Sequence, residues 1–136
     1  MSREVRLIRV AVGIVKRGNA LLVAERPLDK PYSGYWEFPG GKIEINESGR
    51  DALTRELHEE LGIEVLSANL LFEHTHTYPD KTVLLEIWLI DQFQGEPYGK
   101  ENQQLKWATL ADMPALRLLE GNWLILDKIK TMQEFL

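Results

Sequence analysis

Hydrophobic residues near the start of the chain form two runs separated by turn-forming residues. Residues 5–15 and 20–25 are rich in Val, Ile, Leu and Ala, and the intervening KRGN (16–19) suits a tight turn, so we expect a β-hairpin here. Residues 26–35, RPLDKPYSGY, are dense in Pro, Gly, Asp and Ser, which is typical of a long and often functional loop. The following WEFPGGKIE (36–44) predicts a short strand, a Pro-Gly-Gly turn and a second short strand.

The next segment has the periodicity of an amphipathic helix. Its apolar stripe consists of Leu53, Leu57 and Leu61. These leucines repeat at every fourth position, which places them on one helical face. Ser48, with Asp51 three residues later, resembles a capping box in which Asp substitutes for Glu or Gln, and Gly62 supplies a stop signal. The pattern therefore predicts a helix that begins after Ser48 and ends before Gly62.

The second half of the chain predicts three more strands and a second helix. Residues 68–77 and 82–92 are expected to be strands joined by the turn YPDK (78–81), and QLKWATL (104–110) is expected to be another. The stretch from Asn122 onward suits an amphipathic helix. Its apolar positions are Leu124, Ile125 and Ile129. Strands interleaved with two helices predict an α/β sandwich in which helices cover a mixed sheet.

Composition is consistent with this arrangement. The 136 residues suit one domain, so we expect a single domain over residues 1–136, and 44% hydrophobic with 27% charged residues argues against disorder. The absence of cysteine excludes disulfides, thiolate zinc sites and a cysteine nucleophile, and it fits the cytoplasm, where we expect the protein. The run VRLIRVAVGIV is interrupted by Arg6 and Arg9 and is too short to span a bilayer, so we interpret it as a buried strand.

The net charge limits the kinds of partner. A formal charge of −5 argues against a general nucleic-acid binder, because such proteins present a basic face to the polyanion. A small anionic substrate is still compatible with an acidic protein if divalent cations lie between the two negative partners.

An acidic patch borders the apolar stripe of the predicted helix. Glu56 and Glu60 lie beside the leucines at about 100° per residue, and Glu59 lies a little further round. Like charges three or four residues apart destabilise an exposed helix by roughly 0.2–0.5 kcal/mol a pair. A bound divalent cation would relieve that repulsion, since hard cations take carboxylate oxygens as ligands. The spacing alone is equally compatible with a solvated charged face.

The residues around this helix resemble the signature of the Nudix hydrolases. From Gly41 onward, GKIEINESGRDALTRELHEELGI matches that signature at every defined position. These positions are Gly41, Glu47, Arg55, Glu56, Leu57, Glu59, Glu60, Gly62 and Ile63. The resemblance implies an α/β/α sandwich with a central mixed sheet flanked by helices. It also implies cleavage of a nucleoside diphosphate linked to another group, with Mg²⁺ or Mn²⁺ as cofactor.

The same resemblance assigns roles within the motif. Glu56, Glu59 and Glu60 are expected as metal ligands, and Glu56 is also a candidate for activating water. Glu47 and Arg55 would then orient the cluster. The implied chemistry agrees with phosphoryl transfer in general, because metal ions polarise phosphoryl oxygens, neutralise the leaving pyrophosphate and lower the pKa of an attacking water.

Outside the motif, the chain is similar to the MutT branch of this family. The similar stretches are AVGIV, WEFPGGKIE, YPDK, GEPYGKE and the region around Asn122. By this resemblance, Glu101 and Gly40 are expected at the metal site, and Arg26 and Lys42 near the phosphates. Taken alone, Glu101 is better explained as an exposed loop acid and the two basic residues as solvated side chains.

Base recognition in that branch implies three further positions. Asn122 is expected to contact the base, Phe38 to make backbone and ring contacts, and Asp80 to lie nearby. An amide offers a donor and an acceptor together, which suits the edge of an oxidised purine. Asn122 could equally cap the last helix, where Asn is a preferred residue. Lys81 replaces the usual arginine and RLLEG (117–121) replaces a proline-rich stretch, so the pocket differs from that of the familiar relative.

These expectations combine into one functional hypothesis. The resemblance implies a Mg²⁺-dependent nucleoside triphosphate pyrophosphohydrolase that converts 8-oxo-dGTP to 8-oxo-dGMP and pyrophosphate, which removes a mutagenic nucleotide from the pool and protects the fidelity of DNA replication. A preference for CTP or a modified dCTP, a catalytically silent nucleotide-binding module and a structural calcium-binding helix are the alternatives. The expected partner is a small-molecule triphosphate, with neither a nucleic-acid polymer nor a membrane, and the protein is expected to be a monomer or a homodimer.

Overall fold

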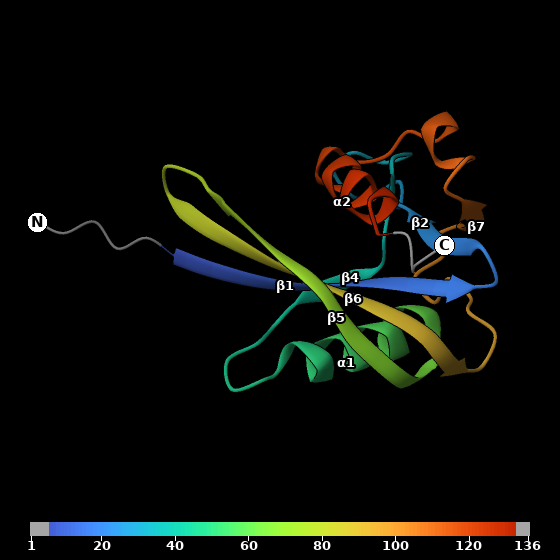
Figure 1. Ribbon diagram of the computed structural model, residues 1–136, viewed down its shortest axis with the longest axis horizontal. Helices are drawn as coiled ribbons and strands as arrows, with labels where there is room; N and C mark the ends of the chain where they lie inside the picture. Colours follow the sequence, from blue (N-terminus) through green and yellow to red (C-terminus); the bar gives the residue numbers. More distant parts are fainter. Residues whose placement is uncertain (1–5, 133–136) are drawn as a thin grey trace, which may run out of the picture.

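The structure, a computed structural model, describes residues 6–132 and contains one large sheet with a helix on each side (Figure 1). The strands are β1 (Arg6–Arg17), β2 (Ala20–Glu25), β3 (Trp36–Glu37), β4 (Gly40–Lys42), β5 (Glu64–Thr77), β6 (Lys81–Gln94) and β7 (Leu105–Thr109). The helices are α1 (Gly49–Leu61) and α2 (Glu120–Lys130), and a 3₁₀ turn, η1 (Met113–Ala115), precedes α2. Neither α-helix in the described part of the chain has the length and apolar character needed to cross a membrane.

Strand β1 organises the sheet. One of its edges pairs in parallel with β6 from Arg6 to Val15, while its other edge is shared by β4, at residues 10–12, and β2, at residues 16–17. The pairs formed by β2 with β3 and β7, and by β5 with β6, are all antiparallel. The sheet is therefore mixed, as the sequence predicted.

The two faces of the sheet carry separate cores. Successive residues of a strand point to opposite faces, so Val12 and Ile14 of β1 pack on the side of α2, whereas Ala11 and Val15 pack on the side of α1. The leucine stripe of α1 lies in the second core, and Ile125 and Ile129 of α2 lie in the first. Figure 1 shows the resulting layers, with α2 and α1 on opposite sides of the sheet. The predicted α/β/α sandwich is confirmed.

The limits of α1 follow from local chemistry. Ser48 Oγ accepts a hydrogen bond from the backbone N–H of Asp51 at 3.0 Å, and Gly62 ends the helix in the left-handed conformation with φ of 70°. A Cβ on Gly49 would overlap the carboxylate of Glu86 on β6, so glycine lets that acidic group approach the start of the helix. The predicted boundaries of the helix are confirmed.

Several strand predictions need correction. The hairpin turn is shorter than expected, because β1 continues to Arg17, and residue 5 lies outside the described residues. Strand β5 starts at Glu64 rather than at residue 68. The predicted Pro-Gly-Gly turn is wrong, since Gly40 and Gly41 belong to β4 and pair with β1. A Cβ on Gly40 would overlap the carbonyl oxygen of Ala11, so the glycine is needed for the close approach of two strands.

Candidate active site

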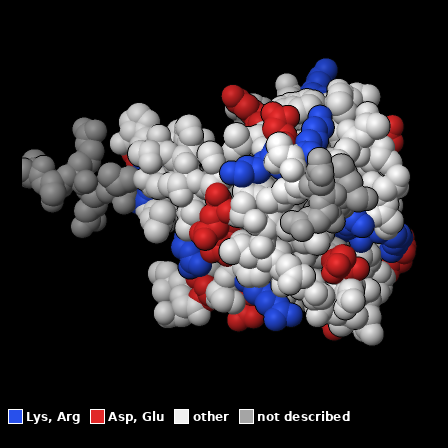
Figure 2. Space-filling model, in the orientation of Figure 1, with Lys and Arg blue, Asp and Glu red and all other residues white. Residues whose placement is uncertain are grey.

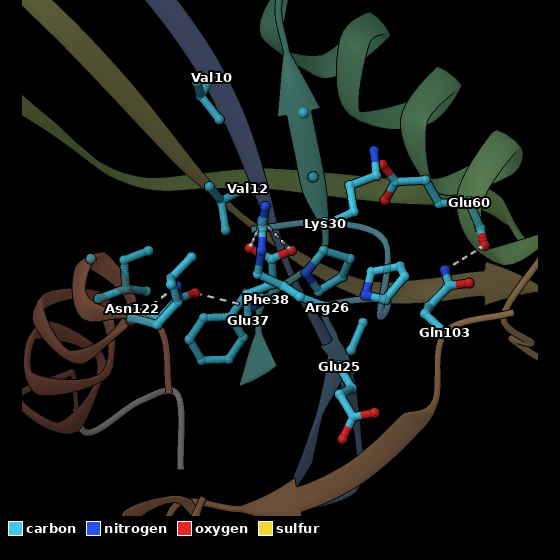
Figure 3. A pocket seen from close by; sticks show the side chains of 18 of the residues that line it. Val10, Val12, Glu25, Arg26, Lys30, Glu37, Phe38, Glu60, Gln103 and Asn122 are labelled. Carbon is cyan, nitrogen blue, oxygen red and sulfur yellow. Dashed lines mark hydrogen bonds and ion pairs between the residues drawn. The ribbon is translucent and has the colours of Figure 1, made fainter. Parts of the chain in front are cut away.

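A cavity of about 590 Å³ opens on the α2 side of the sheet (Figure 3). Strand β1 contributes Val10 and Val12 to its wall, and the loop after β2 contributes Arg26 and Lys30. Strands β2, β3, β4 and β6, the end of α1, the loop before β7 and the start of α2 complete the lining. Segments from most of the chain therefore meet around one hollow, which is the form of a small-molecule site.

Two helix glutamates, Glu56 and Glu60, lie side by side, and Glu60 lines one end of this cavity. Burial is the main cause that raises the pKa of Glu60 to about 9, and hydrogen bonding with Glu56 and the charge of Glu56 raise it further. The charges of Glu101 and Glu37 raise the pKa of Glu60 as well. Glu60 and Glu101 both line the cavity, so carboxyl groups from α1 and from the β6–β7 loop converge there.

We call the group formed by Glu56, Glu60 and Glu101 the acidic end. A glycine makes room for one of its members. A Cβ on Gly41 would lie 2.6 Å from Oε1 and 2.7 Å from Oε2 of Glu56, which is closer than real contacts allow. Glycine at this position of β4 therefore lets the carboxylate of Glu56 lie directly against the strand. The Gly40–Gly41 pair serves close packing on both sides: against β1 through Gly40 and against α1 through Gly41.

Arg55 holds the acidic end from outside the cavity. Its Nε and Nη2 donate to the two carboxylate oxygens of Glu47 at 2.9 Å each, and its Nη1 donates to Glu56 Oε1 at 2.9 Å. Nη2 also donates to the carbonyl oxygen of Lys42 at 3.2 Å. The hydrogen bonds from Arg55, and then that from the backbone N–H of Glu44, lower the pKa of Glu47 to about 2. The predicted grouping of Glu47, Arg55 and Glu56 is present.

The third helix glutamate lies apart from the other two. The side chain of Glu59 is 59% exposed, does not line the cavity, and approaches Arg55 Nη1 only at 3.7 Å. Among residues 6–132, no three acidic or histidine side chains are gathered tightly enough to form a ready metal-binding group. The structure thus brings Glu56 and Glu60 together but does not add Glu59 to them.

The donor set nevertheless fits a hard divalent cation. Such ions prefer oxygen ligands, and Mg²⁺ commonly takes only one or two carboxylates while substrate phosphates and water complete its shell. Glu56 and Glu60 supply adjacent carboxylates whose mutual repulsion a cation would relieve, and Glu101 faces the same space. The absence of a Cβ at Gly41 keeps the approach to Glu56 clear.

Arg26 and the half-buried Glu37 also lie in the wall of the cavity. Arg26 Nη1 lies 3.3 Å from both carboxylate oxygens of Glu37 on β3, and its Nε donates to the carbonyl oxygen of Pro31 at 2.7 Å. Burial raises the pKa of Glu37, although Arg26 and Lys30 oppose this shift. Arg26 and Lys42, both expected near phosphates, line the cavity. Sequence reasoning missed Glu37, whose one signal was a charged residue between the aromatic residues of WEFPGG.

An amide occupies the opposite end. Asn122 Oδ1 accepts a hydrogen bond from the backbone N–H of Phe38 at 3.0 Å, and Asn122 Nδ2 donates to the carbonyl oxygen of Leu119 at 3.3 Å (Figure 3). Asn122 lies in the first turn of α2, which starts at Glu120 after Leu119, so the alternative in which Asn122 caps this helix is wrong. The N–H of Phe38 is already used within the protein, and its side chain is buried.

One expected residue lies away from these contacts. Asp80 is in the exposed turn between β5 and β6 and does not line the cavity. On the face seen in Figure 2, acidic and basic side chains are interspersed rather than gathered into a basic surface.

Comparison with known proteins gives consistent matches. Residues 7–129 match the model of the NUDIX domain. The chain is 34% identical to the 8-oxo-dGTP diphosphatase of Escherichia coli K12 over 126 residues, which cover 92% of this chain and 98% of the relative. It is 38% identical to the CTP pyrophosphohydrolase of the same organism over 104 residues, which cover 76% and 77%.

Solved structures show the same architecture. The E. coli ORF135 protein superposes with a TM-score of 0.85 at 32% identity, covering 95% of this chain and 92% of that protein. A MutT NUDIX hydrolase from Burkholderia pseudomallei superposes with a TM-score of 0.78 at 28% identity, covering 90% and 97%.

Proposed function

The chain belongs to the Nudix hydrolase family, and from that premise we propose that it is a Mg²⁺-dependent pyrophosphohydrolase whose substrate is 8-oxo-dGTP. The products would be 8-oxo-dGMP and pyrophosphate. The observation that carries the proposal is a single cavity with the acidic side chains of Glu60 and Glu101 at one end and a fixed amide at the other. A nucleotide needs both, because its phosphates require cations and its base requires directed hydrogen bonds.

The acidic end would serve the phosphates. Glu56, Glu60 and Glu101 would hold the cation, to which Gly40 could add its backbone carbonyl and Glu59 a carboxylate after a change of rotamer. Mn²⁺ could replace Mg²⁺, since both are hard dications. A bound dication supplies Lewis acidity, charge neutralisation and a lowered pKa for water. Arg26 and Lys42 lie where they could neutralise further phosphate charge.

Water is the proposed nucleophile. Its oxygen would attack the β-phosphorus, the bond between that phosphorus and the bridging oxygen of the α-phosphate would break, and the nucleoside monophosphate would leave. Glu56 is the candidate for taking the proton from water. Arg55, itself held by two hydrogen bonds to Glu47, donates one hydrogen bond to the carboxylate of Glu56, which limits the reorganisation needed during the reaction.

The amide end would serve the base. One lone pair of Asn122 Oδ1 and one hydrogen of Nδ2 are engaged by the backbone of Phe38 and Leu119. A second lone pair and a second hydrogen are left, and their directions are set by these two backbone contacts. This donor and acceptor pair supports recognition of an oxidised purine edge. Asp80, in an exposed turn, could reach the base only if the β5–β6 turn moved.

A pyrimidine triphosphate is the second candidate. It is favoured by the similarity to a CTP pyrophosphohydrolase, which is higher in identity than the match to the 8-oxo-dGTP enzyme although it covers less of the chain. The two substrates share the phosphate chemistry and differ at the base, so the residues around Asn122 would decide between them.

A panel of triphosphates distinguishes these candidates. Purified protein with Mg²⁺ and added inorganic pyrophosphatase would be tested on 8-oxo-dGTP, dGTP, CTP, 5-methyl-dCTP and dATP, with phosphate release as the readout. We expect the highest kcat/KM for 8-oxo-dGTP. A higher value for a pyrimidine would transfer the assignment to the second candidate, and no hydrolysis of any triphosphate would favour a silent binding module or a structural calcium site.

The proposed substrate also bears on the location and the oligomeric state of the enzyme. A free nucleotide as substrate agrees with a cytoplasmic enzyme that needs no membrane, and a monomer is compatible with this proposal. A homodimer is equally compatible with this proposal.

A further inference from the structure

The loop between β6 and β7 is fastened to the end of α1. The backbone N–H of Tyr98 donates to the carbonyl oxygen of Leu61, and that of Lys100 donates to the carbonyl oxygen of Glu60, each at 3.1 Å. Carbonyl groups in the last turn of a helix have no partner within the helix, so these bonds satisfy acceptors that would otherwise need water. The loop that carries Glu101 is thereby attached to the helix that carries Glu60.

The side chain of Gln103 adds a second link. Its Nε2 donates to the carbonyl oxygen of Glu60 at 3.1 Å, and its Oε1 accepts from the backbone N–H of Glu101 at 2.8 Å. One amide thus spans the backbones of two residues whose side chains line the cavity (Figure 3 shows the bond to Glu60). Because both ends of the amide are engaged by the protein, Gln103 itself is held in one orientation.

The loop around this amide is tightly built. Asn102 has a positive φ of 65°, and its N–H donates to the carbonyl oxygen of Gly99 at 3.0 Å. A Cβ on Gly99 would overlap the carbonyl oxygen of Gln103, so the turn closes on itself only with glycine there. On its far side, the carbonyl oxygen of Gln104 accepts from the N–H of Glu25 on β2 at 2.9 Å. The peptide of Glu101 therefore has little freedom to move relative to the sheet.

We propose that Gln103 is a positioning residue that sets the spacing between the carboxylates of Glu60 and Glu101 and thereby the affinity of the acidic end for divalent cations. This inference rests on the proposed function, because it assumes that the acidic end binds cations. Residues that orient metal ligands without touching the metal typically change affinity or activity by about 10- to 100-fold when they are replaced. Gln103 differs from a catalytic residue in acting only through the two peptides that it joins.

The test compares Gln103→Met with Gln104→Met. Methionine is close to glutamine in length but cannot replace the bonds of the amide to Glu60 and Glu101. Gln104 is the matched control, because it is exposed and only its backbone carbonyl, which the substitution keeps, bonds to Glu25. Two measurements are made on metal-free protein: hydrogen exchange at the N–H of Glu101 by NMR, and a titration with Mn²⁺ alone. For Gln103→Met we expect faster exchange and an Mn²⁺ Kd about tenfold higher than in the wild type, with both values unchanged in Gln104→Met.

Enzyme kinetics provide a second measurement, which should stay unchanged if Gln103 only stabilises the fold. For Gln103→Met, the Mg²⁺ concentration that gives half-maximal hydrolysis should rise about tenfold, while the nucleotide KM at saturating Mg²⁺ stays within about twofold. A change confined to KM would overturn the proposal, because it would mean that Gln103 contacts the nucleotide. Faster exchange at Glu101 with an unchanged Mn²⁺ Kd would also overturn it, since the link would then have no effect on cation binding.

A second variant keeps the test informative if the first fails to fold. Gln103→Asn retains the amide but is one methylene shorter, so it cannot reach both peptides, and we expect the same direction of change. Wild-type Mn²⁺ affinity in this variant would contradict the proposal. Should the wild type hydrolyse no triphosphate, the proposed function fails, yet the Mn²⁺ titration and the exchange measurement would still decide whether Gln103 positions the acidic end.

Discussion

The two ends of the cavity are built in different ways. At the acidic end, Arg55, Glu56 and Glu60 come from adjacent turns of one helix, so local helical geometry brings them together. At the amide end, Asn122 meets Phe38 across 84 positions of sequence, and their contact depends on how α2 docks on the sheet. The pairing of Glu56 with Glu60 therefore depends on the geometry of one helix, whereas the contact of Asn122 with Phe38 depends on the whole fold.

The largest expected effect lies at the acidic end. Glu56→Gln keeps the shape of the side chain but removes its charge, and we expect turnover of the preferred triphosphate to fall by about a hundredfold to a thousandfold. The thermal midpoint should show that the fold is retained. Glu73→Gln, on the exposed side of β5, is the matched control and should keep wild-type turnover. Unchanged turnover in Glu56→Gln would refute its role.

A substitution at the amide end should change the selectivity between triphosphates rather than abolish turnover. Asn122→Ala leaves the buried N–H of Phe38 without its partner, which should cost about 1–3 kcal/mol of unfolding free energy, whereas the carbonyl of Leu119 keeps its bond from the backbone N–H of residue 122. The ratio of kcat/KM for 8-oxo-dGTP over dGTP should fall about tenfold or more, because a directed donor and acceptor are lost. An unaltered ratio, measured on folded protein, would remove the purine assignment while leaving the acidic end untouched.

A third prediction concerns how Glu60 makes the stability of the metal-free protein depend on pH. The raised pKa of Glu60, about 9, means that the folded state keeps a proton which the unfolded chain releases above its ordinary pKa of 4.5. Stability should therefore decline as the pH rises from about 4.5 to 9. Glu60→Gln abolishes this loss, so in the presence of a chelator the variant should melt above the wild type at pH 8, with a smaller difference at pH 5.

One result would contradict this prediction for Glu60. A wild type that is as stable as the Glu60→Gln variant at pH 8 without metal would mean that Glu60 is not held in a buried and crowded environment. Added Mg²⁺ should narrow the gap at pH 8, since only the wild type gains a cation at that carboxylate.

The smallest expected effect concerns Glu47. Arg55 lowers its pKa to about 2, so the stability contributed by the ionised carboxylate is fully present above about pH 4.5 and is lost as the pH falls through about 2. Glu47→Gln should flatten the acid limb of the stability profile between these values, and the change should be modest because surface ion pairs are screened by water. Acid unfolding followed by circular dichroism would measure it, and an unaltered acid limb would argue against the Glu47–Arg55 pair.

Sequence predicted the acidic end better than the rest for a physical reason. The helix limits at Ser48 and Gly62, and the proximity of Glu56 to Glu60, follow from helical periodicity over a few residues. What sequence did not predict depends on distant partners. Gly40 and Gly41 looked like a turn because their pairing with β1 is not visible in local composition.

The amide end shows the same limit. Asn122 matched a capping signal, but α2 begins two residues earlier after Leu119, which makes no side-chain cap. Glu59 is three residues after Glu56 and one before Glu60, so the sequence placed it near both. On the helix its side chain points to solvent and towards Arg55 instead. The half-buried position of Glu37 beside Arg26 depends on the pairing of β3 with β2, which brings together residues 11 positions apart.

The most direct test of the account is calorimetric titration of the metal-free wild type with Mn²⁺ and with Mg²⁺, alone and with a non-hydrolysable triphosphate analogue. We expect saturable binding of both ions, strengthened by the analogue and weakened in Glu56→Gln. Absence of binding under all of these conditions would contradict the claim that the paired carboxylates of α1 exist to hold divalent cations against a nucleotide's phosphates.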